Sequence, residues 1–130
     1  MELMKKANKK NFVIVQIESA EAVEIIDSIA AVPGLDGIVL GPNDFTQHIG
    51  FFGQYDHPIM DEAIKKMEDS AKKYGKWSGV ITGNEKLLRR CRAAGMRFFS
   101  VGSELSMLAA GAKATIKLIE DLVKQEEAAS

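Results

Sequence analysis

The segment Leu35–Asp44, which has the sequence LDGIVLGPND, indicates the fold class of this chain. It opens with a short run of apolar and β-branched residues, and such a run predicts a strand buried on both faces. Gly41 and Pro42 end this strand and begin a connection that continues to His57, and a connection of that length is usually functional. Three further runs have the same character and are also predicted strands: residues 12–17, 77–82 and 96–101.

Each predicted strand is followed by a helical pattern, in which apolar residues recur at intervals of three and four. The inward-facing residues are predicted to be Ala22, Ile25, Ile26 and Ile29 in the first helix, Met60, Ala63, Ile64, Met67 and Ala71 in the second, and Leu87, Leu88 and Cys91 in the third. The last helix is predicted to begin at Ser103. The order βαβαβαβα predicts an α/β fold of four consecutive parallel β/α units, which is half of a TIM (β/α)8 barrel.

The composition is that of one globular domain. The chain has 130 residues, of which 46% are hydrophobic, an ordinary value for such a domain. Its 17 Lys and Arg residues against 18 Asp and Glu residues leave a net charge of −1, which argues against a nucleic-acid-binding protein. We predict a single (β/α)4 domain over residues 1–130, with a helical lead-in over residues 1–10 and a frayed tail over residues 125–130.

Cysteine content and hydropathy indicate the cellular location. Cys91 is the single cysteine, which excludes an internal disulfide and suits a reducing compartment. No apolar run approaches the ~18 residues that a membrane helix needs, and none has the form of a secretory signal. We therefore expect a cytoplasmic protein that has neither a membrane nor a nucleic acid as its partner.

Polar residues follow the predicted strands at the end where parallel α/β sheets bind ligands. Glu18 closes the first strand, and Gln16 shares its face because alternate residues of a strand point the same way. A carboxylate in this place costs free energy unless it pairs or binds a cation. The alternative is that Glu18 or Ser19 caps the following helix, and from these residues alone capping is the more ordinary interpretation.

Asp44 occupies the matching place after the second strand. Gly41 permits unusual backbone angles, and the amides of Asn43, Asp44 and Phe45 could hold a carboxylate or a phosphate. A helix cap is again the alternative for Asp44. Glu18 and Asp44 end adjacent strands, which lie ~4.8 Å apart. Two oxygen ligands without Cys or His suit Mg²⁺ or Mn²⁺ and leave positions open for a chelating substrate.

The two histidines of the long connection are weaker candidates. His48 lies four residues after Asp44 and could reach the site, although a solvated loop histidine is the more ordinary interpretation. His57 precedes Pro58, which favours a helix-entry role for His57 over that of a general base.

Five segments occur in an order and spacing that resemble one enzyme family: residues 15–19 (VQIES), 32–37 (VPGLDG), 41–46 (GPNDFT), 57–58 (HP) and 101–103 (VGS). Together they are similar to the C-terminal half of the HpcH/HpaI aldolase family. These are metal-dependent class II pyruvate aldolases, of the 4-hydroxy-2-oxoheptanedioate aldolase type. The resemblance covers about residues 11–122. Phe45 stands where the family usually has Leu, and Glu104 stands where Asp is frequent.

The resemblance implies a reaction and a role for each site residue. The reaction is metal-dependent aldol cleavage or condensation of 4-hydroxy-2-oxo acids, which yields pyruvate and an aldehyde. Glu18 and Asp44 would be the ligands of Mg²⁺, Mn²⁺ or Co²⁺, which would stabilise the enolate as a Lewis acid. Gln16 would hydrogen-bond the keto or enolate oxygen, and the amides of Asn43 and Asp44 would hold the carboxylate of the 2-oxo acid.

The resemblance covers half of a barrel, which limits the expected activity. The family's first half supplies an arginine for the oxyanion and a histidine for proton transfer, and this chain has no counterpart of that half. One oxyanion donor alone contributes ~3 kcal/mol. We therefore expect the isolated chain to be a weak or inactive carbon–carbon lyase, with no catalytic residue assigned in this half. The alternative is a non-catalytic half-barrel remnant or interaction module that binds metal and 2-oxo acid weakly.

The open edges and apolar face of a half-barrel predict self-association. A four-stranded parallel sheet leaves two unpaired edges and, on the side away from its helices, an apolar surface. Two copies could close a barrel, or helices could be exchanged. We therefore expect a homo-oligomer.

Overall fold

The computed structural model describes residues 10–129, with side-chain surroundings for residues 10–126. The chain divides into two compact units, residues 1–100 and 101–130, and each is described by itself. The helical lead-in expected over residues 1–10 lies outside the described residues except for Lys10, which is in a turn. Organisation as a single domain stays a prediction.

The first unit is built on one parallel sheet. Within residues 10–100 its strands are β1 (Ile14–Ile17), β2 (Gly37–Leu40), β3 (Trp77–Ile81) and β4 (Phe98–Ser100). They pair in the order β1-β2-β3-β4, with Gln16 opposite Val39 and Val39 opposite Gly79. Each strand lies inside a predicted run, so the predicted parallel α/β arrangement is confirmed.

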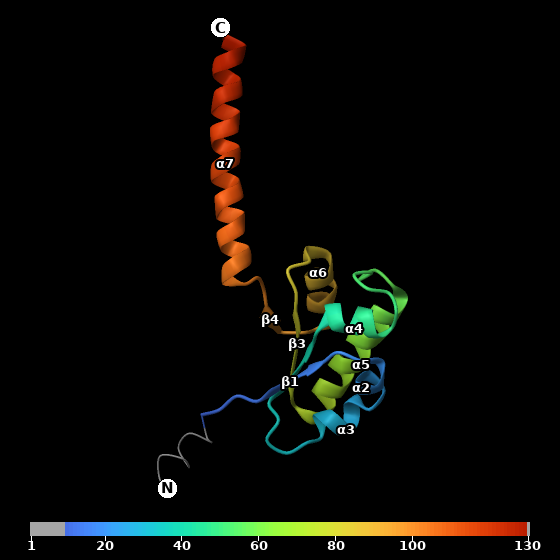
Figure 1. Ribbon diagram of the computed structural model, residues 1–130. Helices are drawn as coiled ribbons and strands as arrows, with labels where there is room; N and C mark the ends of the chain where they lie inside the picture. The colour runs from blue at the N-terminus through green and yellow to red at the C-terminus, as the bar shows by residue number, and fades with distance from the viewer. Residues whose placement is uncertain (1–9, 130) are drawn as a thin grey trace. The chain divides into compact units, whose positions relative to one another are not determined.

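Helices cover one face of this sheet. The described helices of the first unit are α2 (Ala20–Glu24), α3 (Ile26–Ala30), α4 (Pro42–His48), α5 (Pro58–Tyr74) and α6 (Glu85–Ala94). Helix α5 is central, because it contacts α2, α3 and α6 as well as strands β2 and β3 (Figure 1). Alternation along β3 places Ser78 and Val80 beneath the helices, whereas Trp77 and Ile81 are exposed on the other face.

Two helices carry the core as predicted. Helix α5 buries Met60, Ala63, Ile64, Met67 and Ala71, and it ends at Gly75 in the left-handed conformation, with φ of +64°. Helix α6 buries Leu87 and Cys91, with Leu88 half-buried. Against these helices pack the inward residues of the sheet, Ile17, Ile38, Leu40 and Val80.

The first predicted helix differs from the structure. It consists of two short helices that meet at Ile25, which is 56% exposed instead of facing inward. The buried residues are Val23, Ile26 and Ala30. The chain offers apolar residues at 22, 23, 25 and 26, and these cannot all lie on one stripe of a helix.

The long connection also differs from the expectation, because its first part is helical. Helix α4 begins directly after β2, with Pro42 in its first turn, where the missing amide proton of proline costs nothing. The remainder, residues 49–57, folds back onto α4. The Phe51 amide donates to the Thr46 carbonyl oxygen at 2.8 Å, and the Gly53 amide donates to the Thr46 hydroxyl at 3.1 Å.

The second unit contains helix α7 (Glu104–Ala129). The Ser103 hydroxyl accepts a hydrogen bond from the Ser106 amide at 3.2 Å, which suits the predicted start at Ser103. The helix is described to Ala129, and the frayed tail over residues 125–130 stays a prediction. None of the helices described in residues 10–129 combines the length and hydropathy needed to cross a membrane.

Candidate metal and 2-oxo-acid site

Gln16 and Glu18 lie together over Gly41 at the carboxyl end of the sheet. The Gln16 Nε2 atom donates to Glu18 Oε1 at 2.7 Å. A Cβ atom added to Gly41 would lie 2.6 Å from Gln16 Nε2 and 2.9 Å from Glu18 Cγ. Gly41 has a φ of −96°, which any residue adopts, so the expectation of unusual backbone angles is wrong. Glycine is needed there because the side chains of Gln16 in β1 and of Glu18 just after it leave no room for a Cβ.

The helix caps on this edge are provided by other groups. The Ser19 hydroxyl accepts from the Ala22 amide at 3.2 Å and caps α2, so Glu18 is not the capping side chain. Gly41 is the cap residue of α4, which has no side-chain cap hydrogen bond, and Asp44 is the third residue of that helix. Both carboxylates are thus free of the capping role that the sequence left open.

The Glu18 and Asp44 carboxylates are neighbours. The pKa of Glu18 is raised above its ordinary value of 4.5 by partial removal from water, by a hydrogen bond shared with Asp44 and by repulsion from the Asp44 charge. The hydrogen bond from Gln16 acts in the opposite direction and is the smallest of these effects. Two carboxylates this close favour a bound proton or cation between them.

The amino end of α4 places backbone amides beside these carboxylates. Phe45 is the first residue of the helix whose amide can bond within it, and it donates to the Gly41 carbonyl oxygen at 3.0 Å. The amides of Asn43 and Asp44 precede it and have no carbonyl partner inside the helix. They lie where the sequence predicts an anion-binding group.

Tyr55 is a site residue that sequence reasoning missed. Its hydroxyl donates to Asn43 Oδ1, which ties the residue next to Asp44 to the folded-back segment. Arg90 holds this segment in turn, since its guanidinium donates to the Tyr55 carbonyl oxygen at 2.5 Å and to Asp61 Oδ1 at 2.5 and 2.9 Å. The only sequence feature that pointed to this segment was the length of the connection after β2, and length alone does not identify Tyr55 or Arg90.

Neither histidine belongs to the carboxylate pair. His48 Nε2 lies 3.2 Å from Glu21 Oε2. His57 accepts from the Ile59 amide at 3.3 Å and stacks on Phe51 with ring centroids 4.1 Å apart. His57 is therefore the helix-entry residue that its place before Pro58 indicates.

The donor set suits a hard divalent cation with an open coordination sphere. Within residues 10–129, no group of three or more His, Cys, Asp and Glu side chains could hold a metal. Glu18 and Asp44 would provide two carboxylates to a divalent cation and would leave its remaining positions to water or substrate. Burial and the nearby Asp44 carboxylate raise the pKa of Glu18, and a bound cation would relieve the repulsion between the two carboxylates, so this donor pair suits such a cation.

The sequence and the fold both match one protein family. The sequence model of the HpcH/HpaI aldolase/citrate lyase family matches residues 2–111, and the chain belongs to this family. A 5-keto-4-deoxy-D-glucarate aldolase of Shigella dysenteriae is 38% identical over 119 residues, which are 92% of this chain and 45% of the relative. The chain thus spans about half the length of the curated relatives it matches.

Solved structures of the same family have the same fold. The HpcH/HpaI aldolase from Desulfitobacterium hafniense is 28% identical with a TM-score of 0.79, and a family member from Burkholderia cenocepacia is 30% identical with a TM-score of 0.82. Each alignment covers 92% of this chain and 46% of the solved chain. The predicted four β/α units of a TIM barrel are thereby confirmed.

Proposed function

We propose that this chain carries the metal- and pyruvate-binding half of a class II aldolase site. The complete site would cleave or form 4-hydroxy-2-oxo acids, giving pyruvate and an aldehyde. The observation that carries the proposal is the pairing of Glu18 and Asp44 at the carboxyl ends of β1 and β2, with Gln16 bonded to Glu18 over Gly41.

The chain's own residues would divide the work of binding. Glu18 and Asp44 would hold Mg²⁺, Mn²⁺ or Co²⁺, and the bound cation would supply Lewis-acid stabilisation of negative charge on the keto oxygen. The amides of Asn43 and Asp44 would hold the carboxylate of the 2-oxo acid. Gln16 has one amide hydrogen committed to Glu18, so its second hydrogen would be available to the keto oxygen.

The neighbouring backbone would preorganise these groups. The absence of a Cβ at Gly41 lets Gln16 and Glu18 approach the chain that leads to Asp44. Tyr55 would fix the Asn43 side chain, and Arg90 would fix the loop that presents Tyr55. Such supporting contacts commonly change metal affinity by about 10- to 100-fold.

We propose that turnover needs more than this half-site. The residues described here offer no candidate for a proton donor to the leaving group or for a further oxyanion donor. One oxyanion donor alone lowers the activation barrier by about 3 kcal/mol. The isolated chain is therefore proposed to bind metal and 2-oxo acid and to turn over slowly or not at all.

The test of this proposal is a Mn²⁺ titration followed by the loss of the free-ion electron paramagnetic resonance signal. We expect one Mn²⁺ per chain, and we expect Glu18→Gln to weaken binding by at least about tenfold because it removes a charged ligand. Glu62→Gln is the matched control, since Glu62 is exposed on α5. Equal affinities for Glu18→Gln and Glu62→Gln would reject the carboxylate pair as the metal site.

A further inference from the structure

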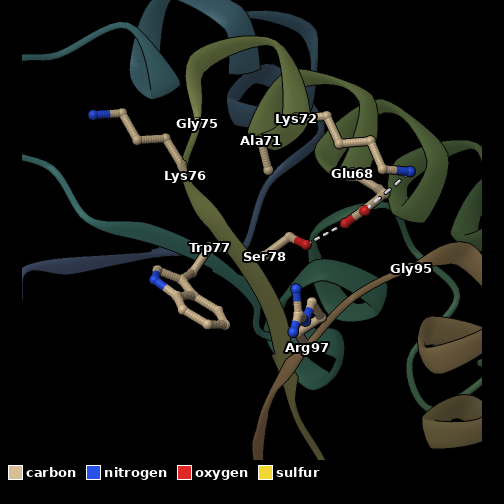
Figure 2. A pocket seen from close by; sticks show the side chains of 9 residues that line it. All are labelled: Glu68, Ala71, Lys72, Gly75, Lys76, Trp77, Ser78, Gly95 and Arg97. Atoms are coloured by element: carbon tan, nitrogen blue, oxygen red, sulfur yellow. Dashed lines mark hydrogen bonds and ion pairs between the residues drawn. The ribbon is translucent and has the colours of Figure 1, made fainter.

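A pocket lies at the end of the sheet where the strands begin, whereas the carboxylate pair lies where they end. It has a volume of about 430 Å³ and is lined by the residues drawn in Figure 2: Glu68, Ala71, Lys72, Gly75, Lys76, Trp77, Ser78, Gly95 and Arg97. These residues come from the last turns of α5, the start of β3 and the turn between α6 and β4. Because all strands of a parallel sheet begin at the same end of the sheet, this pocket is separate from Glu18 and Asp44, which lie at the other end.

The buried carboxylate of Glu68 lies at the bottom of this pocket, and its charge is balanced by Lys72. Its side chain is 7% exposed, accepts a hydrogen bond from the Ser78 hydroxyl and pairs with Lys72 Nζ at 3.2 Å (Figure 2). Gly95 closes over the carboxylate, since a Cβ added there would lie 2.6 Å from Glu68 Oε1. The buried charge of Glu68 is therefore matched by Lys72 and held in one place.

Arg97 and Lys76 leave a surplus of positive charge around this floor. Lys72, Lys76 and Arg97 against Glu68 give the lining a formal charge of 3 − 1 = +2, although the whole chain carries −1. Arg97 takes part in none of the ion pairs found among the residues that the structure describes. Lys76 Nζ uses one of its three hydrogens, toward the Leu35 carbonyl oxygen at 2.7 Å.

The aromatic ring of Trp77 orients Arg97. The guanidinium carbon of Arg97 lies 5.6 Å from the centroid of this ring, which is within the range of a cation–π contact. A guanidinium held by such a contact keeps its in-plane N–H groups available, and their fork matches two oxygens of a phosphate. A guanidinium fork oriented in this way is suited to a divalent oxyanion.

We propose that this pocket is a binding site for a phosphate group, with Arg97 as its main ligand. The source of the group is free inorganic phosphate or a small phosphorylated metabolite. The competing explanation is that the cations only offset the negative end of the α5 dipole. That explanation accounts for Lys72 in the last turn of α5 and for Lys76 just after it, and leaves Arg97, directly before β4, unexplained.

The chain offers a direct optical test, because Trp77 is its one tryptophan. The full chain is titrated with inorganic phosphate while tryptophan fluorescence is recorded, against sodium chloride at equal ionic strength. We expect a saturable change with phosphate and none with chloride. Phosphoserine as a second titrant distinguishes the sources, since a site open to esters binds both and a closed site binds inorganic phosphate alone.

Matched variants test the assignment of Arg97. Arg97→Gln is expected to weaken phosphate binding by about tenfold or more, because it removes a charge-assisted pair. Arg92→Gln removes the same charge from an exposed position of α6 outside the pocket and is expected to change the affinity less than twofold. Circular dichroism checks that both variants are folded. Equal affinities for the two variants, or no saturable signal in the wild-type chain, would overturn the proposal.

Discussion

Gln16 Nε2 lies 2.6 Å from the position that a Cβ of Gly41 would occupy. The Gln16 side chain of β1 therefore packs against the backbone that directly follows β2. We predict that Gly41→Ala displaces Gln16 and with it Glu18, and weakens Mn²⁺ binding by about tenfold, as changes to supporting contacts commonly do. Gly83→Ala is the matched control, since a Cβ at Gly83 would meet nothing within 4 Å. Calorimetric titration of both variants measures the difference, and equal affinities would contradict the packing role of Gly41.

Partial burial and the neighbouring Asp44 carboxylate together raise the pKa of Glu18. Because of this raised pKa, Glu18 in the folded chain stays protonated at pH values above 4.5, where a free glutamate would already be ionised. This protonation stabilises the fold at low pH, and the stabilisation is lost as the pH rises through the raised pKa. Mn²⁺ affinity should rise over the same interval, since the cation displaces the proton.

Asp44→Asn removes the repulsion between the two carboxylates. We predict that the pKa of Glu18 falls toward 4.5 in this variant, with the carboxyl carbon followed by nuclear magnetic resonance as a function of pH. An unchanged titration of Glu18 in Asp44→Asn would show that the two carboxylates do not interact.

Gly79 is required by the close approach of β3 and β4. A Cβ added to Gly79 would lie 2.0 Å from the Phe98 carbonyl oxygen, which is backbone and cannot move aside without breaking the strand pair. We predict that Gly79→Ala lowers the free energy of unfolding by about 2 kcal/mol or more, as overpacking does. Gly83→Ala should leave it nearly unchanged in the same urea denaturation series. A Gly79→Ala protein as stable as Gly83→Ala would refute the contact.

Cys91 should be an unreactive thiol in the folded chain. It is fully buried in α6, and burial raises its pKa to about 11. Since the thiolate is the reactive form, labelling by a disulfide reagent at pH 8 should proceed at the rate of unfolding and should accelerate on addition of urea. Labelling at the rate of a free peptide thiol in native buffer would contradict this burial.

The sheet face away from the helices should drive self-association. It exposes Trp77 at 47% and Ile81 at 38%, and the rings of Phe12 and Phe98 meet on it with centroids 6.4 Å apart. We predict a mass above that of a single chain in light scattering, reduced by Ile81→Lys. Ile25→Lys, at an exposed position on the helical layer, is the control. A single-chain mass at all concentrations would contradict the prediction.

The sequence was sufficient for the elements whose apolar pattern is unambiguous. Helix α5 follows a single stripe from Met60 to Ala71, and both its first-turn proline and its terminal Gly75 are local signals. The break at Ile25 was not predictable in this way, because adjacent apolar residues compete for the core and tertiary packing decides between them.

The part of the site that lies at the ends of the strands could be predicted from the sequence. Alternation placed Gln16 and Glu18 on one face, and parallel pairing placed Asp44 beside them. The contact of Tyr55 with Asn43 and the cationic pocket around Arg97 depend on where loops fold in three dimensions. No periodic pattern encodes such contacts, so sequence reasoning could not find them.

We propose that Glu18 and Asp44 hold a cation that a 2-oxo acid chelates. The most direct measurement is the Mn²⁺ dissociation constant with and without oxalate, a mimic of the pyruvate enolate, for the wild-type chain and for Asp44→Asn. We predict that oxalate tightens Mn²⁺ binding in the wild-type chain and that Asp44→Asn abolishes both the binding and its enhancement. Mn²⁺ binding that is absent, or that is unchanged by Asp44→Asn, would rule out this metal site and favour a half-barrel without one.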